Sequence, residues 1–284
     1  NVSEDWLVAE YAQAGSTFLS AEVFDAPDPS KRVVLTVPAL VHCSVASVTV
    51  GGTAVPAEQD GSYLVPQGSN VVVGFVADPD YALSASTMSF KARDDMALPT
   101  AGRPVSVPLS EVDVVINEIG ASNDEESGIE TLFGGKGLDW IELRNRSSVD
   151  VDVSGWYLTD GPDKNRSKWT RIEGDGVVPA NGYRIVWAAK ADDFDNWSAS
   201  EARVGISLST SGEPLLLAAP NGTKIWEIAN FGKQLKGVSC GLVGETADYG
   251  FFRAPTPGAA NGTDAKGRPT PKVTLSEPHG YKTA

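Results

Sequence analysis

Short runs in which apolar and polar residues alternate recur along most of the chain. In residues 45–50 and 183–187 apolar side chains fall at alternate positions, which is the period of a half-buried β-strand. Pairs such as Gly51-Gly52 and Asn181-Gly182 follow or precede these runs, and they supply the positive φ angles that tight turns require. The pattern therefore predicts an all-β chain.

The spacing of the runs predicts two β-sandwich domains. Between residues 31 and 91 strand-like runs follow one another at roughly ten-residue intervals, as in a small sandwich. Pro99, Gly102, Pro104 and Pro108 then indicate a semi-rigid, Pro-rich linker. We therefore expect one domain over residues 1–108 and a second over 109–262.

Both ends of the chain carry further expectations. Residues 5–11 are compatible with a short N-terminal helix or with an edge strand. Residues 263–284 predict a second linker and the truncated start of another module. The chain is accordingly expected to be a fragment of a longer protein.

Two neighbouring runs, residues 139–145 and 154–160, predict the core of the second domain. Alternation assigns three apolar side chains to the inner face: Ile141, Leu143 and Trp156. The polar residues of the first run, Asp139, Glu142 and Arg144, are interpreted as a polar outer face or as a strand-to-strand ion pair.

Composition and charge narrow the classes of partner. Hydrophobic residues make up 41% of the chain and charged residues 21%, as in ordinary globular proteins. The net charge of −14 opposes binding to nucleic acid and to anionic membrane surfaces. No apolar run reaches membrane-spanning length. We expect no nucleic acid partner and no direct membrane insertion.

The few cysteines and histidines limit catalytic and zinc chemistry. Cys43 and Cys240 cannot form a disulfide framework, although one bridge and two free thiols both remain open. His42 and His279 lie too far apart in the chain to complete a zinc site or a nucleophilic triad. We therefore predict that the chain is not an enzyme.

Acidic residues are plentiful but fall in predicted turns. Paired carboxylates in glycosidases need a cleft as well as the right separation, so we interpret these acids as solvated loops. The candidate calcium ligands are Asp160, Asp163 and Asn165, whose spacing is not that of an EF-hand loop. Apart from calcium, no cofactor is expected.

Six of the seven tryptophans lie in the second predicted domain. Trp197, Trp140 and Trp187 are the candidates for ligand-facing rings that stack on sugars. The alternative is that these rings are buried in the core. Burial of an aromatic side chain there removes about 150–250 Å² of its surface from water, which stabilises the fold.

Seven segments of the second domain together resemble the lamin tail domain family in its bacterial secreted branch. They occur in the family's order: 115–123, 139–145, 154–160, 168–169, 178–189, 208–213 and 255–262. Residues 238–242 depart from the family's pattern. The resemblance implies an immunoglobulin-like β-sandwich and a bacterial extracellular setting, beside hydrolase, nuclease or kinase-like domains. The N-terminal part resembles small immunoglobulin-like modules of bacterial surface proteins.

These observations lead to a functional expectation. We expect a non-catalytic structural or interaction region, serving adhesion, spacing or docking in a secreted or cell-surface protein. The expected partners are a protein, a cell-surface glycan or other domains of the same polypeptide. The alternative is a carbohydrate-binding module attached to a hydrolase or kinase-like domain outside this fragment.

Overall fold

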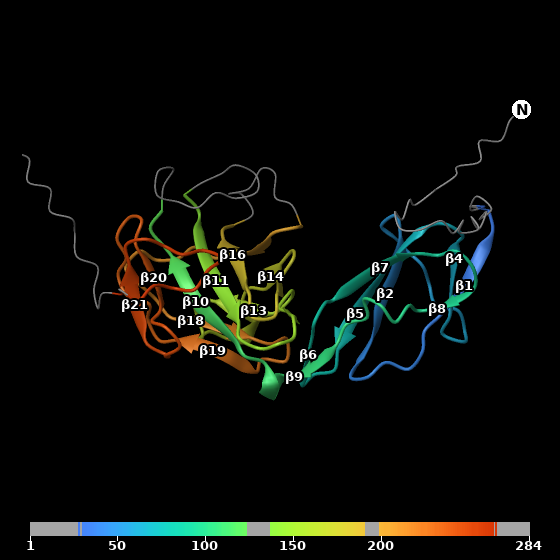
Figure 1. Ribbon diagram of the computed structural model, residues 1–284, viewed down its shortest axis with the longest axis horizontal. Coiled ribbons are helices and arrows are strands. Elements are labelled where there is room, and N and C mark those ends of the chain that lie inside the picture. The colour runs from blue at the N-terminus through green and yellow to red at the C-terminus, as the bar shows by residue number, and fades with distance from the viewer. Residues whose placement is uncertain (1–27, 29, 124–136, 191–198, 264, 266–284) are drawn as a thin grey trace, which may run out of the picture. The chain divides into compact units, whose positions relative to one another are not determined.

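Strands account for nearly all regular structure in the computed structural model (Figure 1). The structure describes residues 28, 30–123, 137–190, 199–263 and 265. Helical structure in these residues is confined to two 3-10 turns, Leu109–Glu111 (η1) and Arg166–Lys168 (η2). The predicted all-β class is confirmed. The helix proposed within residues 5–11 lies outside the described residues.

The chain forms two compact units. Unit 1 comprises Asn1–Leu40, Val45–Phe75 and Thr87–Arg103, and unit 2 comprises Val41–Ser44, Val76–Ser86 and Pro104–Ala284. Because the chain passes between the units several times, they do not separate at a single position such as the predicted boundary after residue 108.

Unit 1 is a small sandwich of two sheets. One sheet has the order β4-β1-β8 and the other β3-β2-β5-β7. Alternate residues of β5, namely Val71, Val73 and Phe75, are buried, so this strand turns one face to the core of the unit. The strands are β1 Arg32–Thr36, β2 Cys43–Val50, β3 Thr53–Ala54, β4 Tyr63–Pro66, β5 Asn70–Ala77, β7 Thr87–Lys91 and β8 Met96–Ala97.

Unit 2 is built on a seven-stranded sheet with the order β14-β17-β16-β11-β10-β20-β21. Its strands are β10 Val114–Gly120, β11 Asp139–Asn145, β14 Ile172–Glu173, β16 Tyr183–Ala188, β17 Ala202–Val204, β20 Ser239–Leu242 and β21 Tyr249–Phe252. In Figure 1, β10, β11 and β16 run side by side, in agreement with their antiparallel pairing.

Two smaller sheets complete unit 2, with the orders β13-β18-β19 and β15-β12-β6-β9. Their strands are β6 Tyr81–Leu83, β9 Ser106–Pro108, β12 Val151–Asp152, β13 Tyr157–Thr159, β15 Val177–Val178, β18 Leu215–Ala218 and β19 Lys224–Ile228. The core contains Ile141, Leu143 and Trp156, so all three predicted inward positions are confirmed.

A β-bulge in β10 decides which side chains of that strand face the core. The register between β10 and β11 shifts between Ile116 and Glu118. A bulge adds one residue to its strand and reverses the facing of every later side chain. Ile116 and Ile119 therefore both join the core, and Glu118 lies opposite Glu142 on the other face of the sheet.

Two segments of the chain contain only short regular elements. After η2 the chain enters β14 only at Ile172. The side chain of Asn165 accepts a hydrogen bond from Ser167 N at 3.0 Å and caps η2, which favours the turn. The Pro-rich segment contains two short strands, β8 and β9, because its prolines leave enough backbone donors to pair with β1 and β6.

Both cysteines are free thiols. Cys240 lies in the core of unit 2, where burial raises its pKa to about 12. Cys43 is half-buried at the start of β2. Of the alternatives left open by the sequence, the structure therefore has two free thiols rather than a bridge.

Candidate functional site

Glu118 and Glu142 form a buried carboxylate pair in unit 2. They face each other across β10 and β11, and both are fully buried at 0% exposure. Alternation placed Glu142 on a polar outer face. That prediction is wrong about solvent exposure, because the C-terminal segment covers this part of the face.

The covering segment is held by backbone and side-chain donors. Thr256 N donates to Glu118 Oε2 at 3.0 Å, and Gly258 N donates to Glu142 Oε2. Ser239 Oγ also donates to Glu118. Buried carboxylates are costly unless hydrogen-bonded, and here the donors come from the chain's own closing segment.

Two asparagines complete the network. Asn117, in the bulge, donates from Nδ2 to Glu142 Oε1 at 2.7 Å and to Asn261 Oδ1 at 3.0 Å. Asn261 donates in return to the Asn117 carbonyl at 3.0 Å. A Cβ at Gly241 would lie 2.6 Å from Asn261 Nδ2, so glycine at that position makes room for the amide.

Burial raises the pKa of both carboxyl groups. Desolvation raises the pKa of Glu142 to about 7, opposed by the bonds from Gly258 and Asn117 and reinforced by the charge of Glu118. Desolvation also raises the pKa of Glu118, opposed by its bonds from Ser239 and Thr256. Shifted carboxyls are typical of active sites but also of structural networks. Full burial and the use of their oxygens as hydrogen-bond acceptors favour the structural role here.

The other two polar residues of the run 139–145, Asp139 and Arg144, have local roles. Asp139 is half-buried and accepts from Leu208 N at 3.2 Å, and burial raises its pKa to about 6. Arg144 pairs with Glu245 at 2.9 Å. Glu245 belongs to the turn between β20 and β21, so the expected strand-to-strand ion pair is replaced by a strand-to-turn pair.

Two of the three candidate ligand-facing tryptophans are buried. Trp140 is 1% exposed and Trp187 3% exposed, and the two residues are paired across β11 and β16. A Cβ at Gly120 would lie 2.3 Å from Trp140 Nε1, so the indole packs directly over that glycine. The prediction that Trp140 and Trp187 face a ligand is corrected. Trp197 lies outside the described residues.

The candidate calcium ligands lie beside cations. Asp160 Oδ1 is 3.9 Å from Lys164 Nζ, and the Asn165 side chain caps η2. In the described residues no group of three or more His, Cys, Asp or Glu side chains could hold a metal ion. Calcium binding by Asp160, Asp163 and Asn165 stays a prediction, which the neighbouring ammonium group opposes.

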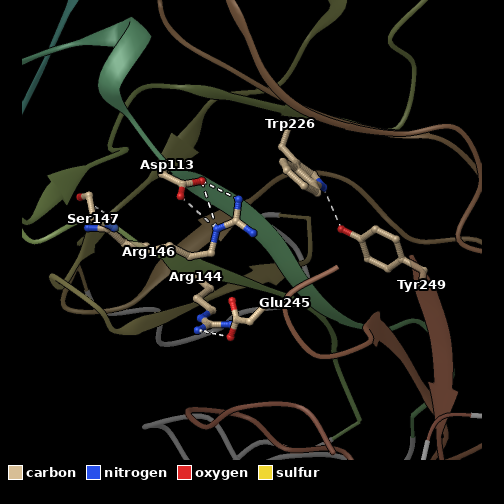
Figure 2. Close-up of polar contacts among 8 residues, drawn as sticks. Asp113, Arg144, Arg146, Ser147, Trp226, Glu245 and Tyr249 are labelled. Carbon is tan, nitrogen blue, oxygen red and sulfur yellow. Dashed lines mark hydrogen bonds and ion pairs between the residues drawn. The ribbon is translucent and has the colours of Figure 1, made fainter. Parts of the chain in front are cut away.

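A second polar cluster lies nearer the surface (Figure 2). Arg146 makes a two-pronged contact with Asp113, with Nη2 to Oδ1 at 2.7 Å, and its guanidinium lies 5.7 Å from the Trp226 ring centroid. Trp226 Nε1 donates to Tyr249 OH at 2.8 Å, and Tyr249 OH donates to the Ile116 carbonyl. The cluster ties β19 to β21, which are edge strands of different sheets.

We expect a coupling of about 0.5–1 kcal/mol between Asp113 and Arg146, because the pair is two-pronged but half-exposed. The double-mutant cycle Asp113→Asn, Arg146→Gln and the double variant, followed by urea unfolding, measures it. The matched control is the cycle on Lys224 and Glu227, which lie 2.8 Å apart and are more exposed. A larger coupling in the control pair would contradict this assignment.

Comparison with known proteins agrees with this architecture. Residues 108–232 match the family model of the Lamin Tail Domain. Residues 108–232 are a lamin tail domain. Lamin tail domains are a non-enzymatic immunoglobulin-like family, so this part of the chain is a non-catalytic module.

The other two comparisons add little to the match with the lamin tail domain family. No curated protein matches the sequence of this chain. A DUF4876 family protein from Bacteroides thetaiotaomicron VPI-5482 resembles the chain at 13% identity over 66% of each chain, with a TM-score of 0.22. The match spans slightly less than two thirds of that protein's chain. In the described residues no helix is long and apolar enough to cross a membrane.

Sequence reasoning missed the role of the two glutamates in the lamin tail domain. The available signal was a charged residue inside an apolar run, with Glu118 between Asn117 and Ile119 and Glu142 between Ile141 and Leu143. A carboxylate at such a position needs a buried partner. The donors lie in residues 255–261, more than a hundred positions away, and the family match does not reach them.

Proposed function

We propose that this chain is a non-catalytic interaction region of a larger bacterial extracellular or surface protein, in which it serves adhesion, spacing or docking. One observation carries the proposal. Glu118 and Glu142, neighbouring carboxyl groups whose pKa is raised by burial, are fully buried and accept hydrogen bonds from the chain's own Thr256, Gly258 and Asn117. Groups held in this way stabilise a fold and have no free oxygen facing a substrate.

The alternative, a carbohydrate-binding module with a tryptophan platform, loses support from two of its rings. Trp140 and Trp187 are buried side chains of the seven-stranded sheet. An aromatic platform needs exposed ring faces, so a glycan ligand of this chain would have to use other residues.

A cell-binding assay tests the proposal. The fluorescently labelled chain is expected to bind cells of the organism that produces it, in a saturable manner. Loss of binding after protease treatment of the cells would indicate a protein partner, and loss after periodate oxidation a glycan. Absence of saturable binding would contradict an adhesive or docking role.

A substrate panel tests the non-catalytic part. The chain is expected to turn over no chromogenic glycoside, ester or phosphate above background. Turnover that disappears in both Glu118→Gln and Glu142→Gln, with folding retained, would show that the pair is catalytic.

A further inference from the structure

A short cationic segment stands out on the acidic chain. Residues 164–171 carry four cations, Lys164, Arg166, Lys168 and Arg171, in a protein whose net charge is −14. All four side chains are exposed. The preceding Asp160 and Asp163 leave this stretch with more positive than negative charges. We call these four residues the cationic surface.

Two of the cations gather around one aromatic ring. The guanidinium of Arg171 lies 4.5 Å from the Tyr157 ring centroid, and that of Arg166 lies 5.5 Å from it. Cation–π contacts of this length hold arginine side chains in place. The Tyr157 ring itself is 8% exposed and packs edge-on against Trp169 at 5.7 Å.

The remaining contacts of these arginines are with neutral acceptors. Arg171 donates to the Gly155 carbonyl at 2.6 Å and to Tyr157 OH at 2.8 Å. Arg166 donates to the carbonyls of Asn221 and Pro220 at 2.5 and 2.7 Å. A guanidinium has five N–H donors, so each arginine keeps donors for a ligand while its position is already set.

Several other arginines of unit 2 have carboxylate partners. Four of them pair with carboxylates at 2.7 to 3.3 Å: Arg144 with Glu245, Arg146 with Asp113, Arg184 with Asp175 and Arg203 with Glu173. Within the described residues neither Arg166 nor Arg171 has a carboxylate at ion-pair distance, and the same holds for Lys168. The cationic surface therefore keeps unneutralised charge.

The segment that carries the cationic surface is internally held. Trp169 Nε1 donates to the Lys164 carbonyl at 3.1 Å, and Asn165 caps the 3-10 turn. A Cβ at Gly222 would lie 2.6 Å from Arg166 Nη1, so glycine makes room for that guanidinium. Because these side chains are already held in place, they lose less conformational entropy when a ligand binds.

We propose that the cationic surface binds an acidic polysaccharide, with carboxylate groups seated on Arg166, Lys168 and Arg171. Arginine forks match carboxylates in a bidentate geometry, and the half-buried Trp169 beside them offers part of a ring to a sugar. A duplex nucleic acid carries one charge per about 1.7 Å, and the acidic remainder of the chain repels so dense a polyanion. A polysaccharide with one carboxylate per sugar meets less repulsion.

Binding to immobilised polygalacturonate tests this proposal, which rests on the proposed function and specifies its ligand. The wild-type chain is expected to bind, more weakly as salt increases, and not to bind the fully methyl-esterified polymer. Lys168→Glu is expected to weaken binding roughly threefold to tenfold, because it replaces an attraction by a repulsion at an exposed site. Lys168→Arg is expected to retain binding.

Lys233→Glu is the matched control. Lys233 is also exposed. It follows β19, past the open end of the β18–β19 hairpin, whereas Asn221 and Lys224 lie at the turn end of that hairpin. The Lys233→Glu substitution makes the same change in net charge as Lys168→Glu. It is expected to leave the affinity for polygalacturonate within about twofold of the wild type. Equal losses in both variants, equal binding of the methyl ester, or equally tight binding of duplex DNA would each overturn the proposal.

The two proposals fail separately. If the chain binds cells saturably but does not bind polygalacturonate, the acidic-polysaccharide site is wrong and the adhesive role stands. If it binds polygalacturonate through Lys168 but does not bind cells, the site stands and the adhesive role is contradicted.

Discussion

Replacing Trp140 with alanine is expected to lower the free energy of unfolding of unit 2 by about 3–5 kcal/mol. The side chain is 1% exposed, lies opposite Trp187 across two strands and packs over Gly120. Truncation leaves a cavity between elements that cannot close without moving strands of the seven-stranded sheet. Urea unfolding followed by tryptophan fluorescence and far-UV circular dichroism measures the loss.

Trp169→Ala is the matched control for Trp140→Ala. Trp169 is half-buried against a small cluster at the edge of the unit, so its loss is expected to cost less than the loss of Trp140. Gly120→Val gives a second, independent approach, because the added side chain would collide with the Trp140 indole. A cost below about 1 kcal/mol for Trp140→Ala would show that its packing is not as described.

Raising the pH from 4.5 to 8 is expected to destabilise unit 2 through Glu142. The native state keeps the Glu142 proton up to a pKa of about 7, whereas the ordinary value is 4.5. Below pH 4.5 both the native and the unfolded state are protonated, and the contribution of Glu142 is fully present. Between these values the native state binds more protons than the unfolded state, so stability falls as pH rises. The upper bound is about 3 kcal/mol, at about 1.4 kcal/mol for each unit of pKa shift.

Comparison with Glu142→Gln isolates this effect. Glutamine keeps the shape of the side chain and does not ionise, so the stability of the variant is expected to change less between pH 4.5 and 8 than that of the wild type. Urea unfolding at pH 4.5, 6 and 8 measures both. Glu245→Gln, which removes an exposed carboxylate from the same unit, is the control for loss of a negative charge. An equal pH dependence in the wild type and Glu142→Gln would contradict the role of Glu142.

The pH response also bears on the closing segment of the chain. Glu142 accepts from Gly258 N, and Glu118 accepts from Thr256 N. Both residues use their carboxylate oxygens to hold residues 255–261 on the sheet. The same contacts therefore connect ionisation of the pair to the stability of that segment, in line with a structural rather than a catalytic use of the two acids.

Local pattern was sufficient for the class and the core. Ile141, Leu143 and Trp156 are buried as alternation predicted, because a half-buried strand must turn its apolar side chains to one face. The order of the motifs was sufficient for the family, which the match over residues 108–232 supports. The cationic run 164–171 was also visible in the sequence, but its unneutralised charge depends on where the carboxylates of other strands lie.

Long-range contacts decided what alternation could not. A period of two assigns side chains to two faces, yet it does not say whether the second face meets water. Here residues 255–261 cover Glu118 and Glu142 on that face, and Trp140 and Trp187 are buried as well. The bulge at Asn117 also reverses the facing of Glu118. The sequence by itself therefore determined the strands, the inner face and the family. Only the tertiary structure decided whether the outer face is buried or exposed to solvent, because covering it requires segments that are distant in the chain.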